Sequence, residues 1–264
     1  MRQECLRPTA GGALLLLSIF LTGCASSLYG WQVRTSSTPM PPSFQPAVFE
    51  QHPVALFGAI TPPAFRGNEV TLSYELNQIL HKVSPHWKVM SPQELTKRIN
   101  RHGLAGEYAK MRADYELSHI LDGGTLRKIA FALGVRYVFQ PHLAAFSQTM
   151  TDRAKVPGFD FRIAQTRSSN MRVSLQLWDA ETGEMVWASM AETTMQNEAV
   201  SQDPVYMEDV ARATLGSLVT DFKDRKTAST YTSVNRFLNN LIEEAVPQEK
   251  PEPQKIIEPD KKTE

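Results

Sequence analysis

Short apolar runs and amphipathic stripes alternate along the middle of the chain, a pattern typical of proteins built from both strands and helices. Residues 54–60 (VALFGAI) are continuously apolar, which predicts a strand that is buried on both faces. Between residues 68 and 82, leucine and isoleucine recur at i, i+4, i+7 and i+8, which predicts a helix with one apolar face. A similar stripe predicts a helix over residues 205–222, and a further helix is expected over residues 105–120. This order predicts an α/β (α+β) fold with a mixed β-sheet packed against helices.

Helix start and stop signals refine these boundaries. Ser91 and Glu94, with a proline directly after the serine, form a capping box and predict a helix start. Residues 125–133 predict a helix that ends at Gly134, because glycine suits the left-handed position after a helix. A strand over residues 135–146 follows.

The clearest hairpin lies further along the chain. Residues 171–178 alternate between apolar and polar side chains, and residues 185–193 return as the second strand. The connecting turn, residues 179–184 (DAETGE), has a glycine near its end, which supplies the positive φ that such turns require.

The first 24 residues resemble an export signal. Arg2 and Arg7 precede an apolar run over residues 13–21, which is too short for a membrane-spanning helix of ~20 residues and suits a signal-peptide core. The run ends in the tetrapeptide LTGC, which resembles the bacterial lipobox. The resemblance implies cleavage after Gly23 and acylation of Cys24 with palmitate and other fatty acids. An ordinary secretory signal or a buried apolar helix is the alternative.

Processing at this site accounts for both cysteines. Cys5 leaves with the signal peptide (residues 1–23), and Cys24 becomes a thioether, so we expect neither cysteine catalysis nor a disulfide. Ala25 follows the cysteine, and by resemblance to enterobacterial sorting this favours the outer membrane, with the domain facing the periplasm. Exposure of the domain on the cell surface is the alternative.

Composition divides the mature chain into three parts. Residues 24–52 hold the acylated cysteine and four prolines among serines and threonines, so we predict an extended tether. Residues 246–264 are dominated by Pro, Glu and Lys and predict a disordered tail. Residues 53–245 remain as one periplasmic α/β domain, with a last helix over residues 233–245.

Three segments of this domain resemble a known superfamily. They are PVALFGAI, residues 126–139 (LRKIAFALGVRYVF) and residues 173–187 (VSLQLWDAETGEMVW). They are similar to the TolB amino-terminal domain, the curli-secretion-channel lipoprotein and the peptidoglycan-synthase-activator lipoproteins, over roughly residues 53–222. The resemblance implies a non-enzymatic protein that binds other envelope proteins or assembles into rings. We interpret Asp179, Thr182 and Trp187 of the hairpin motif as structural.

The segment over residues 146–170 bears on the ring alternative. A channel of the curli type needs membrane-crossing hairpins whose strands alternate over ~9–11 residues. Apolar residues alternate here only in part, and six charged residues crowd the same stretch. We therefore predict a loop in solvent or a binding loop, with a membrane hairpin as the alternative.

Charge and composition exclude several classes. The chain carries 28 basic and 28 acidic residues, so it lacks the positive surplus of a nucleic-acid-binding protein. With 42% apolar residues, it is neither a mostly disordered chain nor a protein with many membrane spans.

No catalytic or cofactor motif stands out. The chain has no nucleophile elbow, no phosphate-binding glycine loop and no zinc-hydrolase histidine pair. His81 and His86, five residues apart, are the one weak metal candidate, and we take the carboxylate pairs as solvated helix charges. The six histidines are His52, His81, His86, His102, His119 and His142. The carboxylate pairs are Glu208 with Asp209, Asp221 with Asp224, and Glu243 with Glu244.

The sequence thus predicts a lipid-anchored, non-enzymatic envelope protein with no catalytic, cofactor-binding or metal-binding residues. Its expected partners are membrane lipid, through Cys24, and an unidentified envelope protein, and an oligomer is left open. A subunit of an outer-membrane secretion or transport structure is the first alternative. An envelope hydrolase is the weaker one.

Overall fold

The computed structural model describes residues 28–155, 162–199 and 205–233. In these residues seven strands form one sheet in the order β3-β2-β4-β5-β6-β1-β7. The strands are β1 Leu28–Ser37, β2 Val54–Leu56, β3 Val89–Met90, β4 Tyr137–Lys155, β5 Arg162–Asp179, β6 Glu184–Ala199 and β7 Ala228–Thr232. β2 runs parallel to β3 and β4, and the other neighbouring pairs are antiparallel, so the sheet is mixed as predicted.

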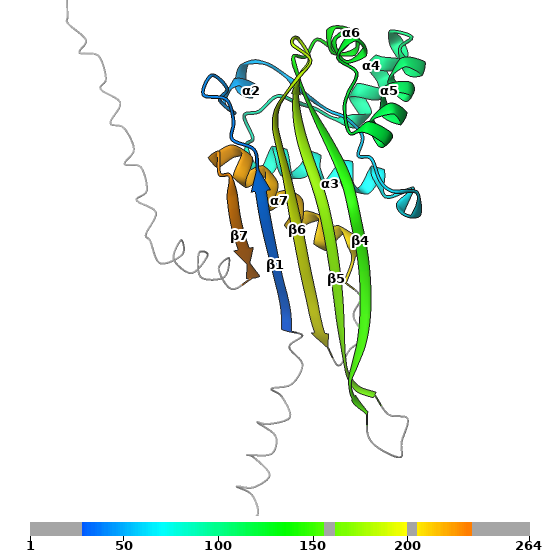
Figure 1. Ribbon diagram of the computed structural model, residues 1–264, viewed down its shortest axis with the longest axis vertical. Coiled ribbons are helices and arrows are strands. Elements are labelled where there is room, and N and C mark those ends of the chain that lie inside the picture. Colours follow the sequence, from blue (N-terminus) through cyan, green and yellow to red (C-terminus); the bar gives the residue numbers. More distant parts are fainter. Residues whose placement is uncertain (1–27, 156–161, 200–204, 234–264) are drawn as a thin grey trace, which may run out of the picture.

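Helices cover much of one face of this sheet and one end of the other. The helices are α2 Val48–Gln51, α3 Glu69–Val83, α4 Pro92–Arg101, α5 Ala105–Ser118, α6 Gly123–Leu133 and α7 Met207–Asp224. Figure 1 shows α3 and α7 behind the long strands, and α4, α5 and α6 gathered at the upper end.

No helix in the described ranges is long and apolar enough to cross a membrane.

The larger apolar core lies between the sheet and the helices α3 and α7. Its centre is Phe222 of α7, whose ring lies 5.9 Å from Phe49, 5.3 Å from Phe139 and 4.9 Å from Trp187, measured between centroids. All four side chains are buried. Burying such rings contributes a large share of the stabilising free energy, because each removes more apolar area from water than an aliphatic residue does.

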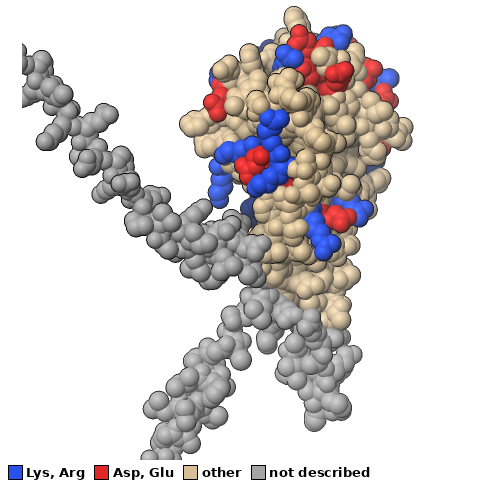
Figure 2. All heavy atoms as spheres, turned by 60° about the vertical axis from the view of Figure 1, so that its left-hand side comes forward, with Lys and Arg blue, Asp and Glu red and all other residues tan. Residues whose placement is uncertain are grey.

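A second, separate core lies on the opposite face under α4, α5 and α6. It joins Leu95, Tyr115 and Leu126 of these helices to Val138 and Trp178 of the sheet. Away from these helices the same face is uncovered and polar. The exposed residues of β1, β5 and β6 on this open face are Gln32, Arg34, Ser36, Asn170, Arg172, Met190, Glu192, Thr194 and Gln196. In the view of Figure 2, charged side chains gather in separate groups and much of the visible surface carries none.

The tether prediction is wrong for residues 28–52. Residues 28–37 form β1, which lies between β6 and β7, and residues 48–51 form α2. Phe44 and Phe49 of the same segment are buried in the larger core. Prolines mark the turns that lead from β1 to α2, and the apolar residues between them give the segment a core to pack against.

One buried carboxylate joins β1 and β7 to α7. Asp221 has no exposed surface and accepts hydrogen bonds from the hydroxyls of Thr35, Ser229 (2.8 Å) and Tyr231. Burial and the neighbouring Asp221 raise the pKa of Tyr231, so this hydroxyl stays a donor at neutral pH. The network satisfies a charge that would otherwise be costly to bury.

The loop prediction for residues 146–170 is also wrong for the part of this segment that the structure describes. β4 continues to Lys155 and β5 begins at Arg162, and the two strands pair up to these ends. The exposed side chains of β4 in this stretch are mainly polar, and Met150 is the exposed large apolar one.

The local sequence signals are confirmed. Ser91 Oγ accepts a hydrogen bond from the Glu94 amide (3.3 Å), and Gly134 ends α6 with a φ of 70°. The predicted hairpin is β5–β6, and the predicted helix over residues 205–222 is α7. The signal peptide, Gly23, Cys24, the tail and nearly all of the last predicted helix lie outside the described residues.

Candidate interaction surface at the helical end

The helices α4 and α6 each begin at a capping side chain that accepts a hydrogen bond from the first turn. Asp122 Oδ1 accepts a hydrogen bond from the Thr125 amide (2.8 Å) at the start of α6, as Ser91 does for α4. These caps satisfy backbone donors that would otherwise lack partners in the first turn.

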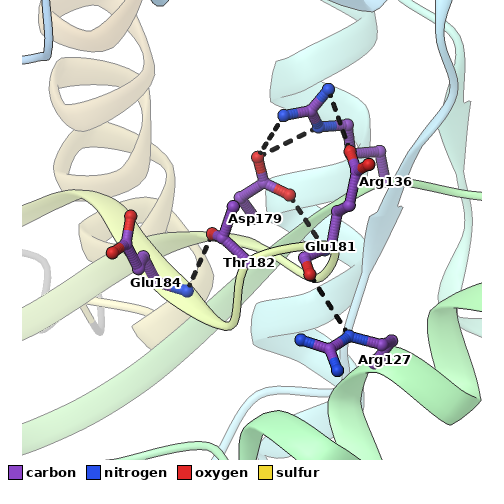
Figure 3. A network of polar contacts seen from close by, with 6 residues as sticks. All are labelled: Arg127, Arg136, Asp179, Glu181, Thr182 and Glu184. Atoms are coloured by element: carbon purple, nitrogen blue, oxygen red, sulfur yellow. Dashed lines mark hydrogen bonds and ion pairs between the residues drawn. The ribbon is translucent and has the colours of Figure 1, made fainter.

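A polar network fastens the β5–β6 turn against this end (Figure 3). The Arg136 guanidinium donates two hydrogen bonds to Asp179 Oδ2, at 3.0 and 2.7 Å, and lies 3.1 Å from Glu181 Oε2. Asp179 Oδ1 accepts from the Glu181 amide (2.9 Å), and Arg127 of α6 donates to the Glu181 carbonyl (3.2 Å). The turn and α6 are therefore held together.

The structure explains the roles of Asp179, Gly183 and Trp187 in the hairpin motif. Asp179 closes the turn, as predicted. Gly183 has a φ of 78°, and a Cβ atom added there would lie 3.4 Å from the Cα of Gly123 in α6, so the turn and the helix are in close contact. Trp187 is buried in the larger core.

Further bonds join the three helices to one another and to the sheet. Arg98 of α4 donates to the Leu133 carbonyl of α6 (2.9 Å), and Lys128 of α6 pairs with Glu107 of α5 (2.7 Å). The Tyr115 hydroxyl donates to Gln176 of β5 (2.9 Å). Burial raises the pKa of Tyr115 to about 12, which keeps its hydroxyl protonated.

Large apolar side chains nevertheless project into solvent from this rigid end. Leu117 near the end of α5 and Phe131 on α6 are each 88% exposed, and Ile120 in the following loop is 62% exposed. Exposed leucine or phenylalanine on a well-braced helix gains no free energy from folding, so these residues are candidate anchors for a partner. The sequence pattern does not reveal them, because apolar periodicity marks only the side chains that face the core.

The described residues include one shallow pocket, of about 470 Å³, between α3, β3 and α4. Its charged side chains already have partners. Arg98 pairs with Glu94 (2.8 Å), Lys88 donates to a backbone carbonyl (3.2 Å), and His81 Nδ1 donates to another (2.8 Å). The hydroxyl in the lining, Ser91 Oγ, accepts the hydrogen bond from the Glu94 amide that caps α4.

The histidines and carboxylates that the sequence singled out are dispersed. In the described ranges no three His, Cys, Asp or Glu residues are grouped to hold a metal ion. Asp209 lies 3.3 Å from Arg212, and Asp224 lies 2.8 Å from Lys226, so both carboxylates form ion pairs. Glu243 and Glu244 lie outside the described residues.

One histidine pair does come together where α5 meets the sheet. The rings of His119 and His142 lie 5.0 Å apart between centroids, and Tyr115 packs against both. Burial, with His119 nearby, lowers the pKa of His142, while Glu116 opposes the shift. His142 therefore remains neutral at neutral pH.

Comparisons with known proteins find similar solved structures but no family. No protein-family model matches the chain, and no curated protein matches its sequence. Solved structures do match, among them the PelC dodecamer from Paraburkholderia phytofirmans, with 11% identity and a TM-score of 0.40 over 72% of this chain and 97% of that one.

Two further structures give similar values. Lipoprotein GNA1162 from Neisseria meningitidis matches with 12% identity and a TM-score of 0.38, over 71% of this chain and 99% of that one. The LpoB C-terminal domain from Escherichia coli matches with 14% identity and a TM-score of 0.35, over 53% of this chain and 81% of that one. At such identities and TM-scores these structures say nothing about the partner or activity of this chain.

Proposed function

We propose that this chain is a non-enzymatic, lipid-anchored protein of the bacterial outer membrane whose domain binds another envelope protein in the periplasm. Acylation of Cys24 supplies the anchor, because two or more acyl chains hold a protein stably where one does so only marginally. Ala25 favours the outer membrane by resemblance to known sorting signals.

The observation that carries the proposal is the short link between Cys24 and the sheet. Leu28, the first residue of β1, follows Cys24 by four residues, so the link spans at most ~13 Å. An acylated Cys24 thus holds the domain directly on the membrane, in place of the long tether that the prolines suggest.

This placement assigns different roles to the two ends of the sheet. The end at which β1 starts faces the lipid. The β5–β6 turn and α6 lie at the other end of β5, ~43 Å from Thr166, which is level with Leu28. Leu117 and Phe131 then point away from the membrane, where a protein partner can reach them.

The anchor is tested by metabolic labelling with a palmitate analogue. We expect the wild-type chain to take up the label and to fractionate with the outer membrane. Cys24→Ala abolishes both, whereas the matched control Cys5→Ala, which changes a residue of the signal peptide, leaves both unchanged. An unlabelled wild-type chain, or a labelled Cys24→Ala variant, contradicts the anchor.

The partner site is tested with a photo-crosslinking amino acid in cells. We expect residues 117 and 131 to cross-link to a discrete envelope protein. Tyr74 of α3, which is 51% exposed on another surface, serves as the control and gives no such product. Cross-links between copies of the chain favour the assembly alternative, and cross-links from position 74 alone contradict the proposed surface.

A further inference from the structure

Two histidine side chains from distant segments meet where α5 ends against the sheet. His119 directly follows α5, and His142 lies on β4, opposite Ser174 of β5. Their ring centroids are 5.0 Å apart, and the ring planes are tilted by 53°. Tyr115, four residues before His119, is buried and packs against both rings. The fold therefore holds the two imidazoles side by side.

The separation of the two rings matches that of two imidazoles on one metal ion. An imidazole nitrogen binds zinc at ~2.0–2.1 Å, and the ring centre lies ~1.1 Å behind that nitrogen. Two rings on one tetrahedral ion, with an angle of ~109° at the metal, then have centroids ~5 Å apart. The distance between His119 and His142 agrees with this value.

The ring nitrogens of both histidines are accessible to a ligand. Neither ring makes a hydrogen bond to another described residue, and the buried polar atoms without a partner in the described ranges include none of their nitrogens. His119 is exposed and His142 is half-buried, so solvent reaches the pair. A neutral imidazole has one nitrogen with a free lone pair, which is the atom that binds a metal ion.

The surroundings of the pair favour a cation. His119 caps the C-terminus of the 14-residue helix α5, where the helix dipole places partial negative charge. Burial and the nearby His119 lower the pKa of His142, whereas the Glu116 carboxylate opposes this shift. Glu116 therefore attracts positive charge to the position of the two rings.

The backbone at His119 indicates that its side chain has a role. Its φ is 56°, in the left-handed region that favours glycine. Glycine takes the same position after α6, as Gly134. After α7 the position belongs to Arg225, whose side chain donates a hydrogen bond to the Pro41 carbonyl (3.5 Å). A side chain retained at such a position has a contact to make, and that of His119 is with His142 and Tyr115.

We propose that His119 and His142 together bind a divalent transition-metal ion such as Zn²⁺ or Cu²⁺, each ring supplying one nitrogen. Imidazole suits these ions, whereas Mg²⁺ prefers oxygen ligands. Because the described residues place no third His, Cys, Asp or Glu at this site, the other positions on the ion are open to water or to a group on another molecule. The site does not depend on the proposed anchor or on the proposed partner.

Zinc binding is tested by isothermal titration calorimetry on the full-length protein, purified without a histidine tag. We expect one Zn²⁺ per chain, and we expect His119→Gln and His142→Gln each to weaken binding by an order of magnitude or more. The matched control replaces His81 and His86, the pair that spacing in the sequence suggests, with glutamine and should bind as the parent does. Mg²⁺ should not compete. Circular dichroism verifies that each variant is folded.

Three outcomes overturn the inference. They are a parent protein that binds no Zn²⁺, equal binding by the parent and the His119→Gln variant, and a loss of binding in the control variant alone. In the last case the metal belongs to His81 and His86. Since His119 is exposed, its substitution tests the site without disturbing the core.

Copper tests the ligand set directly. The electron paramagnetic resonance spectrum of Cu²⁺ bound to the parent should show two imidazole nitrogens, and the spectrum of His119→Gln or His142→Gln should show one. Histidines with a purely structural role leave the number of coupled nitrogens unchanged when they are replaced. The same spectrum for the parent and both variants therefore overturns the inference.

Discussion

The two faces of the central sheet differ in what covers them, and the burial of the side chains of β5 shows this difference. On one face Met171, Val173 and Leu175 are all buried under α7 and α3. On the other face Trp178 is buried under α4–α6, but Arg172, six residues away, is exposed and pairs with Glu192 of β6. One strand therefore carries a continuous apolar face and a face that changes from apolar to polar where the helices stop.

The polar residues of the second face lie outside the core because nothing in the described part of the chain covers them, and not because the strand is irregular. The covered face supplies stability. The open face and the two ends of the sheet remain available to contact other molecules. Substitutions that separate these roles test the distinction.

The largest expected effect is on the covered face. Phe222→Ala removes the ring at the centre of the larger core and should lower the free energy of unfolding by about 4 kcal/mol. Arg172→Ala on the open face should change it by less than about 0.5 kcal/mol, because its ion pair is half exposed. Urea denaturation followed by circular dichroism measures both, and similar losses for the two variants would contradict the division of roles.

The next effect concerns the buried carboxylate that ties the edge strands to α7. Asp221→Ala leaves the hydroxyls of Thr35, Ser229 and Tyr231 without their acceptor and should lower the free energy of unfolding by about 3 kcal/mol. Asp224→Ala, three residues on, breaks only an exposed ion pair and should have a much smaller effect. Thermal unfolding compares the two, and an equal change in Tm would show that the network does not carry the stabilisation.

A smaller and more local effect is expected at the helical end. Asp179→Ala removes the acceptor that holds Arg136 and closes the β5–β6 turn, and should lower the free energy of unfolding by about 1.5 kcal/mol. Hydrogen exchange should speed up in the turn and at the start of α6. Thr182→Ala, which removes one bond of 3.2 Å, is the milder control. Unchanged exchange in α6 would mean that the turn does not brace the helices.

The smallest expected effect depends on pH. His142 has a lowered pKa in the folded domain, whereas the unfolded chain binds a proton near the ordinary value of 6.5. Between these two values the unfolded chain holds more protons, so the free energy of unfolding should fall as the pH drops below 6.5. His142→Gln should weaken this dependence between pH 7 and pH 5, measured by urea denaturation. An unaltered slope would assign the dependence to other groups.

Local features of this protein were predictable from the sequence because local spacing encodes them. The β5–β6 hairpin has strict alternation and a glycine at its turn, and α7 has an apolar stripe over 18 residues. The cap at Ser91 depends on a residue three positions away, and Gly134 depends on its own backbone conformation. None of these needs a distant partner.

The candidate surfaces were less accessible to prediction. Leu117 and Phe131 have the same residue types as buried positions, and their exposure depends on where α5 and α6 pack. The interpretation of β1 as a tether failed for a related reason. Val33 and Thr35 alternate with exposed polar residues, but their partners in β6 and α7 lie more than 150 residues away.

The sequence by itself determined several helices, the β5–β6 hairpin and the class of fold, because 3.6-residue and two-residue periodicities need only neighbouring residues. It also contains the lipobox-like tetrapeptide, and so the proposed anchor. Tertiary structure decided that β1 pairs between β6 and β7, that α4–α6 cover only one end of a face, and that the β4–β5 pair extends past β1. These outcomes depend on long-range pairing and packing, whose free energy exists only once distant segments are in contact.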